Sequence, residues 1–325
     1  MKKTLIIILF LQIFFLSVSD TKKSVLAEDQ LPSWNSGIRE KIVSYTDMVT
    51  DPKNPGFIPE SERFAVFDND GTLWAEQPVI EELFIIYYAK KMIEKDPSLK
   101  NKSPFNRVND FYSNGKFVIK DRRVFDEIVG IVHEGMTNEE FQKTAEAFFR
   151  ETKYPGLNVS LGKTVYQPQL ELMNYLRKKG FKVYICSGGE SDFMRVISEK
   201  YYGISKEQVI GSELVFEYNE NTNVMIRRSK LYTDNNGRAK AVNIYQRLGR
   251  PAVFAVGNVR SGGDIYMLRY SQASKYPSFQ LLIDHDDEKR EFLYSESDNI
   301  SLEWAKKYNW NVVSMKNDWK QIFPK

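Results

Sequence analysis

The sequence predicts an α/β fold, a doubly wound parallel sheet of the Rossmann-like type with an inserted helical cap domain. Short apolar runs, typical of buried parallel strands, alternate with segments of helical periodicity. Several of these runs end in small or polar residues, as strands do at the edge where α/β sheets bind ligands. One long helical stretch, residues 79–159, interrupts the alternation and is expected to form the cap.

The first residues of the chain have the pattern of a secretory signal. Two lysines precede the apolar run Leu5–Leu16, and residues 25–27 are small or modest in size, as a cleavage site requires. An apolar run of about a dozen residues is shorter than the roughly 20 that span a bilayer. We therefore expect a signal peptide over residues 1–27, a periplasmic or secreted mature protein, and no stable membrane anchor after cleavage.

Composition and charge exclude several classes of protein. The chain is 42% hydrophobic and 27% charged, an ordinary globular balance that excludes a disordered or fibrous protein. It has 46 basic and 43 acidic residues, and four of these lysines and one aspartate lie in the expected signal, which leaves 42 of each. A nucleic-acid partner would favour a basic face, so we expect none. The single cysteine, Cys186, excludes an internal disulfide and is expected to be a buried structural thiol.

Residues 28–60 are expected to form an N-terminal helix over 36–50 and a linker, and residues 61–78 and 160–325 the α/β core. The first core strand is expected at Phe64–Phe67, where four apolar residues precede a polar turn. Further strands are expected at Lys182–Cys186, Ala252–Val256, Gln280–Asp284 and Asn311–Ser314, with a hairpin at 213–217 and 224–227 and helices at 168–179 and 239–248.

The expected cap, residues 79–159, carries amphipathic helical spacing near its start. Thr137 and Glu140 match the pattern of a capping box before a second apolar helix. Three arginines in the cap could bind a substrate carboxylate, although arginines are more often ordinary surface residues: Arg107, Arg122 and Arg123.

The sharpest chemical signal is the segment Asp68–Leu73, Asp-Asn-Asp-Gly-Thr-Leu, directly after the first strand. Two carboxylates two residues apart point to opposite sides of an extended chain. The chain must therefore turn at Asp70, and Gly71 permits that turn. Alone, this pattern is also typical of a solvated turn. The strand before it and the matching motifs downstream favour a site.

With this segment the sequence resembles the haloacid dehalogenase superfamily of phosphohydrolases, whose first motif is D-x-D-x-T. Its second motif, an apolar strand ending in Ser or Thr, is matched by Val183–Ser187, and Gly188 and Gly189 are similar to the phosphoserine phosphatase branch. Lys240 stands where the third motif places a lysine that opens a helix. The resemblance runs from about residue 64 to residue 268, with the motifs in the family's order.

The resemblance implies a role for each motif residue. Asp68 would attack phosphorus and form an aspartyl-phosphate, and Asp70 would protonate the leaving alcohol and later deprotonate water. Ser187 would donate its hydroxyl to a phosphoryl oxygen, and Lys240 would offset negative charge on the phosphate and on Asp68. Taken singly, Ser187 and Lys240 are also explained as a strand-end turn residue and an exposed helix-start lysine.

The resemblance also implies a Mg²⁺ cofactor and a substrate-binding set. Oxygen ligands suit this hard cation, and the implied ligands are Asp68, the backbone carbonyl of Asp70, Asn258 and Asp264. The implied substrate-binding residues are Glu76, Gly188 and Gly189. Glu76 lies one position before the place where the phosphoserine phosphatase pattern has its acidic substrate contact.

The fourth motif departs from the family pattern, because Asn258 and Asp264 are six residues apart where about four is usual. Either residues 259–260 form a bulge, or the ligand set is rearranged. Two glycines at 262–263 would let the loop turn Asp264 back toward the metal. An Asp264 carboxylate more than about 7 Å from that of Asp68 would be too far to share one metal ion and would favour an impaired protein.

These observations predict an exported, magnesium-dependent phosphatase that hydrolyses a small phosphorylated metabolite. The alternative is a non-catalytic binding or scaffold protein of the same fold with a degraded metal site. Hydrolysis of carbon–halogen bonds is disfavoured, because the relatives that perform it lack the second acid that Asp70 supplies. His285 lies either at the active rim or, as we prefer, in a solvated acidic turn, and His133 is expected at the surface or in the cap. No pattern indicates an oligomeric state.

Overall fold

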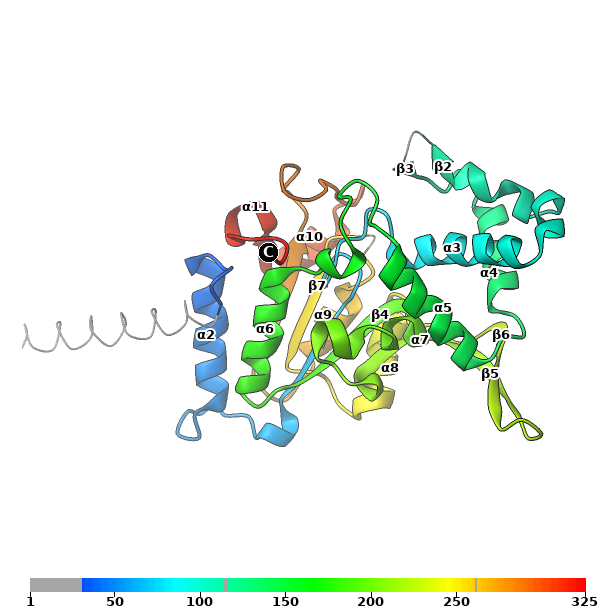
Figure 1. Ribbon diagram of the computed structural model, residues 1–325. Coiled ribbons are helices and arrows are strands. Elements are labelled where there is room, and N and C mark those ends of the chain that lie inside the picture. The colour runs from blue at the N-terminus through cyan, green and yellow to red at the C-terminus, as the bar shows by residue number, and fades with distance from the viewer. Residues whose placement is uncertain (1–30, 114–115, 261) are drawn as a thin grey trace, which may run out of the picture.

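The computed structural model describes residues 31–113, 116–260 and 262–325. The expected signal peptide lies outside these ranges, so its prediction stands as made. Within them, helices cover both faces of a central sheet, and a group of helices projects from one side of it (Figure 1). No helix in the described ranges is long and apolar enough to cross a membrane.

The sheet has seven strands in the order β6-β5-β4-β1-β7-β8-β9. The strands are β1 (Phe64–Phe67), β4 (Lys182–Glu190), β5 (Val209–Asn219), β6 (Val224–Thr233), β7 (Phe254–Asn258), β8 (Phe279–Asp284) and β9 (Asn311–Ser314). All neighbouring pairs are parallel except β5 and β6, which form an antiparallel hairpin. The chain builds outward from β1 first to one side and then to the other, which confirms the predicted doubly wound α/β fold.

The middle strand, β1, shows why the sheet forms here. All four of its side chains are buried, as expected for a parallel strand covered on both faces. Val66 packs in one apolar layer and Phe67 in the other, because successive side chains point to opposite faces. The register pairs Phe67 with Ile185 of β4 and with Val256 of β7, so the polar residues that follow these strands meet at one edge.

Two helical layers cover the sheet. The layer that holds Phe67 includes α2 (Ser36–Thr50) and α6 (Gln167–Lys178), which lie side by side in Figure 1 and are joined by a hydrogen bond between the Thr46 and Tyr175 hydroxyls. The opposite layer contains α8 (Arg238–Leu248), α9 (Ile265–Ser271) and α10 (Ile300–Tyr308). Shorter helical segments are α7 (Ser191–Arg195), α11 (Met315–Asp318), a π-turn at 198–202 and 3₁₀ turns at 60–62, 97–101, 105–111, 161–163 and 206–208.

Between β1 and β4 the chain forms the projecting group of helices, α3 (Ile80–Lys95), α4 (Arg122–His133) and α5 (Asn138–Glu151). The predicted capping box is present before α5: the Thr137 hydroxyl accepts the Glu140 N–H, and the Glu140 carboxylate accepts the Thr137 N–H. A short ribbon of β2 (Tyr112–Ser113) and β3 (Lys116–Phe117), which the helical periodicity did not predict, lies within this segment.

The remaining differences from the sequence-based expectations are at element ends and in helices that were not predicted. Strand β4 was expected to end at Cys186 but runs to Glu190, because Glu190 pairs with Ser212 of β5 after a shift in register. Strand β7 begins at Phe254, two residues later than expected. Helices α7, α9, α10 and α11 were not predicted. The helix over 36–50 and the strands at 64–67 and 311–314 are confirmed with the expected bounds.

The capping box allows a test of how much the N-cap of α5 stabilises the protein. We expect Thr137→Ala to lower the free energy of unfolding by about 1 kcal/mol, because the N-terminal N–H groups of α5 lose their side-chain acceptor. Urea denaturation followed by circular dichroism measures the change. Thr222→Ala is the matched control, because the exposed Thr222 hydroxyl has no hydrogen-bond partner among the described residues. Equal urea midpoints for the two variants would contradict a stabilising role for the Thr137 N-cap of α5.

Candidate active site

A cavity of about 470 Å³ lies where the ends of β1, β4 and β7 meet the cap helices α3 and α4. Its wall contains all of the residues that the sequence predicted for catalysis, substrate binding and metal binding. They are Asp68, Asp70, Glu76, Ser187, Gly188, Gly189, Lys240, Asn258 and Asp264. The structure therefore brings together four motifs that are spread over almost 200 residues of chain.

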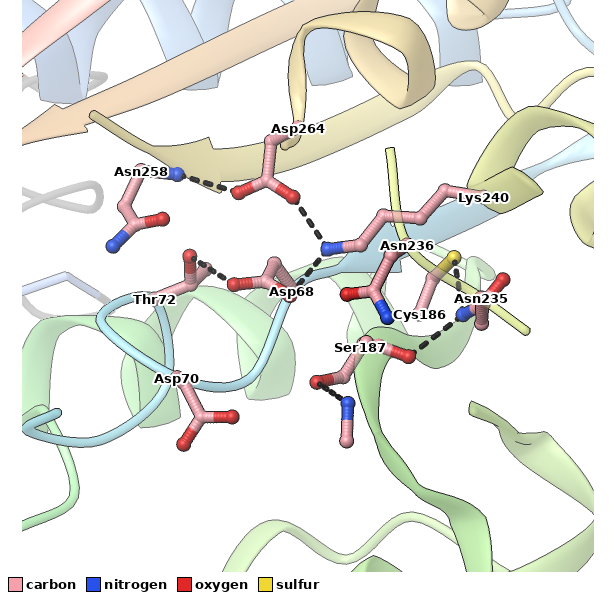
Figure 2. Close-up of polar contacts among 12 residues, drawn as sticks. Asp68, Asp70, Thr72, Cys186, Ser187, Asn235, Asn236, Lys240, Asn258 and Asp264 are labelled. Carbon is pink, nitrogen blue, oxygen red and sulfur yellow. Dashed lines mark hydrogen bonds and ion pairs between the residues drawn. The ribbon is translucent and has the colours of Figure 1, made fainter. Parts of the chain in front are cut away.

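The centre of the site is one lysine between two carboxylates. Lys240 Nζ donates to Asp68 Oδ1 at 2.6 Å and to Asp264 Oδ1 at 2.5 Å, and all three side chains are buried (Figure 2). Burial alone would lower the pKa of Lys240, but Asp264 and Asp68 raise it, so the ammonium stays charged. Burial and Asp264 raise the pKa of Asp68 to about 8, although the Lys240 ammonium lowers it. Two buried carboxylates thus share one lysine.

The turn predicted after Asp68 is present and is built around Gly71. Gly71 has φ +68°, and a Cβ there would lie 1.9 Å from Asn258 Nδ2, so only glycine fits. Asp70 then points away from Asp68 (Figure 2), and its Oδ1 accepts the Trp74 indole N–H at 2.8 Å. Burial raises the pKa of Asp70, and the Trp74 hydrogen bond lowers it. Trp74 thereby fixes the orientation of a carboxylate that faces the cavity.

The position of His285 differs from the one preferred on the basis of the sequence. We preferred a solvated acidic turn, but the side chain is fully buried, and its Nε2 donates to the Gly71 carbonyl at 2.8 Å. Its Nδ1 contacts Glu291 Oε2 at 3.2 Å, and its ring stacks on Tyr294. The acidic neighbours suggested exposure, but the end of β8 brings His285 beneath the turn that carries Asp70. His285 therefore supports the backbone of the turn at Gly71, next to Asp70.

Ser187 is held from its backbone, which leaves its hydroxyl at the cavity. Asn235 Nδ2 donates to the Ser187 carbonyl at 2.7 Å, and Ser187 Oγ accepts the Gly189 N–H at 3.2 Å (Figure 2). A Cβ on Gly188 would lie 2.1 Å from Asn236 Oδ1, so a larger residue would displace this side chain, which precedes α8. The Ser187 hydroxyl proton is therefore available to a ligand. Cys186, one residue earlier, is buried as predicted.

The long fourth motif folds back on itself. Asn258 N–H donates to Asp264 Oδ2 at 2.9 Å, so the loop returns Asp264 to the strand it left. Because one Nζ contacts both Asp68 and Asp264, their nearest carboxylate oxygens lie within about 5 Å of each other. The separation that would favour an impaired site is not found. Both Asp264 oxygens already accept protein donors, from Lys240 and from Asn258.

Glu76 lies beside this motif. Its Oε1 accepts Asn258 Nδ2 at 2.9 Å, and its Oε2 forms an ion pair with Arg260. Burial raises the pKa of Glu76, and Arg260 lowers it. The contact fixes the Asn258 amide so that Oδ1 turns toward Asp68 (Figure 2). Arg260 was not predicted as a site residue, because Glu76, its partner, lies 184 residues earlier in the chain.

The cap supplies the opposite wall of the cavity, which includes Glu81, Glu82, Arg122, Phe125 and His133. Of the three cap arginines considered from the sequence, only Arg122 is among the cavity-lining residues; Arg107 lines a separate depression. His133 is a buried cap residue, and burial and Arg227 lower its pKa to about 3. It therefore faces the cavity as a neutral imidazole.

The donor set is compatible with a hard cation. Asp68 carries a carboxylate, Asn258 directs its amide oxygen toward it, and the surrounding acids leave a surplus of negative charge. No group of three or more His, Cys, Asp or Glu side chains arranged as metal ligands occurs in the described parts of the chain. A Mg²⁺ site here would therefore combine two side chains with a backbone carbonyl and water, a set typical of an ion that keeps several waters.

Comparisons with known proteins bear on the fold and on the family of the chain. A search of the curated proteins found no match. Among solved structures, a protein of unknown function from Anaerococcus prevotii matches with a TM-score of 0.55 and 16% identity over 87% of this chain and 92% of its own. A protein of unknown function from Bordetella pertussis has a TM-score of 0.49 and 15% identity, over 78% and 98%. A phosphoserine phosphohydrolase-like protein from Francisella tularensis has 0.37 and 16%, over 77% and 94%.

These structural likenesses concern the fold, and the family follows from the sequence itself. The family model of haloacid dehalogenase-like hydrolases matches residues 65–269. This range starts within β1 and ends within α9, so it holds all four motifs that line the cavity and the whole cap. The chain belongs to the haloacid dehalogenase-like hydrolase family.

Proposed function

We propose that the mature protein is an exported, magnesium-dependent phosphatase that hydrolyses small phosphomonoesters through an aspartyl-phosphate intermediate. The observation that carries the proposal is the convergence of Asp68, Asp70, Ser187 and Lys240 on one cavity, with the Lys240 ammonium in contact with Asp68. Each group has the chemistry that one part of phosphoryl transfer needs, and the arrangement leaves the Asp70 carboxylate and the Ser187 hydroxyl facing the cavity.

In the first step, an Asp68 carboxylate oxygen bonds to phosphorus as the bond to the alcohol oxygen breaks. That oxygen takes a proton from Asp70 and leaves as the alcohol. In the second step, water attacks phosphorus, Asp70 takes a proton from the water, and the bond from phosphorus to Asp68 breaks. Asp70 is suited to both transfers, because burial raises its pKa and Trp74 fixes one of its oxygens.

Ser187 and Lys240 act on charge and position. The Ser187 hydroxyl donates to a phosphoryl oxygen, and its own oxygen is oriented by the Gly189 N–H. Lys240 faces Asp68 as a fixed cation, so its field acts on the phosphoryl group without reorganisation. Asp264 holds Lys240 in this place, which makes Asp264 a positioning residue.

The proposed Mg²⁺ ligands are the Asp68 carboxylate, the Asp70 carbonyl and Asn258 Oδ1, with Asp264 supporting the set through Lys240 and the Asn258 N–H. When bound, the ion would reduce the repulsion between the anionic nucleophile and the phosphate. The non-catalytic alternative required a degraded fourth motif. The return of Asp264 to within about 5 Å of Asp68 favours the catalytic proposal instead.

Removal of the nucleophile tests the proposed reaction. We expect Asp68→Asn to lower phosphate release from 4-nitrophenyl phosphate by more than about 10⁴-fold, because an amide cannot form the acyl-phosphate. Asp70→Asn should instead slow breakdown of the intermediate, so phosphorylated protein accumulates and is detected by intact mass. Asp51→Asn, at an exposed site in the linker, is the matched control. Near wild-type turnover by Asp68→Asn would exclude the aspartyl-phosphate mechanism.

The fourth motif gives a second test, in which magnesium is varied. We expect Asp264→Asn to raise the Mg²⁺ concentration for half-maximal activity about tenfold or more, because Lys240 and the Asn258 N–H lose a charged acceptor. Asn258→Asp should be tolerated or should tighten binding, because it adds a carboxylate. The Mg²⁺-dependent rise in Tm provides a readout that is independent of turnover. An unchanged magnesium titration for Asp264→Asn would mean that this residue has no part in the site.

A further inference from the structure

The cavity also indicates which alcohol the phosphate is attached to. Resting on the function proposed above, we propose that the substrate is a phosphomonoester of a small amino alcohol, whose cationic ammonium group is bound by Glu81 and which carries no carboxylate. Three features of the cavity wall lead to this inference: the position of Glu81 relative to Asp70, the pairing of the surrounding charges, and the apolar side chains beside Glu81.

Glu81 lies close enough to Asp70, the proposed general acid, for one small alcohol to reach both. It stands in the first turn of α3, and a Cβ on Gly189 would lie 2.8 Å from Glu81 Oε2 and 3.8 Å from Asp70 Oδ2. Because both oxygens lie near this one point, the two carboxylates are no more than about 7 Å apart. If the alcohol oxygen receives its proton from Asp70, a group attached to the second or third carbon of the alcohol would reach Glu81.

Glu81 lacks a cationic partner. Among the described residues, its oxygens accept only the backbone N–H of Glu190, at 3.3 and 3.1 Å. Burial and the nearby Glu190 raise the pKa of Glu81 to about 8. A carboxyl group in this setting gains more from a cation than one that is already paired. The ammonium group of a ligand would supply that cation.

Apart from Asp70, the other charges of the wall are already paired with one another. The described lining holds six carboxylates and three Lys or Arg side chains. Lys240 bonds Asp68 and Asp264, Arg260 pairs with Glu76, and Arg122 pairs with Glu82. In the described wall, no Lys or Arg is therefore left for a substrate carboxylate. Two of its acids have no ion pair: Asp70, the proposed general acid, which accepts the Trp74 indole N–H, and Glu81. This inventory favours a cationic alcohol over a zwitterion such as serine.

Apolar side chains also line the cavity: Val79 and Ile85, from the chain on either side of Glu81, and Phe125 and Val129 of α4. Methylene or N-methyl groups of a small amino alcohol would contact these side chains, whereas a sugar would leave its hydroxyls without partners there. The Phe125 ring already receives a cation on its face, since the Arg122 guanidinium lies 5.0 Å from its centroid. An ammonium group close to this ring would gain in the same way.

The test compares a cationic ester with its neutral isostere. In the presence of Mg²⁺, we expect wild-type kcat/KM for phosphocholine to exceed that for 3,3-dimethylbutyl phosphate, which has carbon in place of the charged nitrogen, by about tenfold or more. Phosphoethanolamine should likewise exceed phosphoserine. Glu81→Gln should bring the ratio of the cationic ester to the isostere close to one. Glu94→Gln, an exposed change on the same helix, should leave the ratio at the wild-type value.

Calorimetry with choline and 3,3-dimethylbutan-1-ol measures the same discrimination without turnover, and Glu81→Gln should abolish it. Equal binding of the two alcohols by the wild type would overturn the inference, as would equal kcat/KM for the two esters or a preference for phosphoserine. If 4-nitrophenyl phosphate and every other ester were left intact while choline still bound through Glu81, the proposed phosphatase would fail and the cation subsite would stand.

Discussion

The contact of Lys240 with Asp68 and Asp264 is the interaction on which the site depends. It joins the end of β1, the loop after β7 and the start of α8, three segments that the sheet brings to one edge. Without the ammonium, two buried carboxylates would face each other within about 5 Å. Buried acids without a cationic partner tend to lose their charge by becoming protonated. A protonated Asp68 is a poor nucleophile. The ion pair therefore sets the spacing of the acids, and Lys240 opposes the rise in the pKa of Asp68 that burial and Asp264 cause.

A second buried cation performs the corresponding task where the cap meets the core. Arg227 of β6 is fully buried, pairs with Glu190 and Asp192 near the end of β4, and contacts His133 and Asn138 of the cap. Lys240 and Arg227 belong to separate networks. Glu190 links the Arg227 network to the cavity, because its carboxylate pairs with Arg227 and its backbone N–H donates to Glu81, which lines the cavity. The position of the cap wall is thus tied to the strand that carries Ser187.

The sequence predicted the parts of this site that depend on local signals. An apolar run that ends in Asp-x-Asp-Gly, or in Ser-Gly-Gly, marks both a strand and the residues at its end, so Asp68, Asp70 and Ser187 could be named before any geometry was known. Trp74 and Arg260 were not named, and the preferred placement of His285 in a solvated turn was wrong, because the roles of all three are contacts with residues placed by the fold. His285 is the clearest case: its neighbours are acidic, yet 214 residues separate it from the carbonyl that it supports. Glu81 has no sequence signal beyond a place in a helix.

The altered fourth motif shows why a change of loop length need not change a site. Lengthening the connection from Asn258 to Asp264 by two residues adds only about 0.3 kcal/mol of closure entropy. The Asp264 carboxylate is anchored at two points, the Lys240 ammonium and the Asn258 N–H, and a hydrogen bond to a charged group contributes about 1.5–3 kcal/mol. The anchors outweigh the longer loop several-fold. The position of Asp264 is therefore set by its partners and not by the number of residues before it, which explains how the spacing departs from the family pattern while the carboxylate remains beside Asp68.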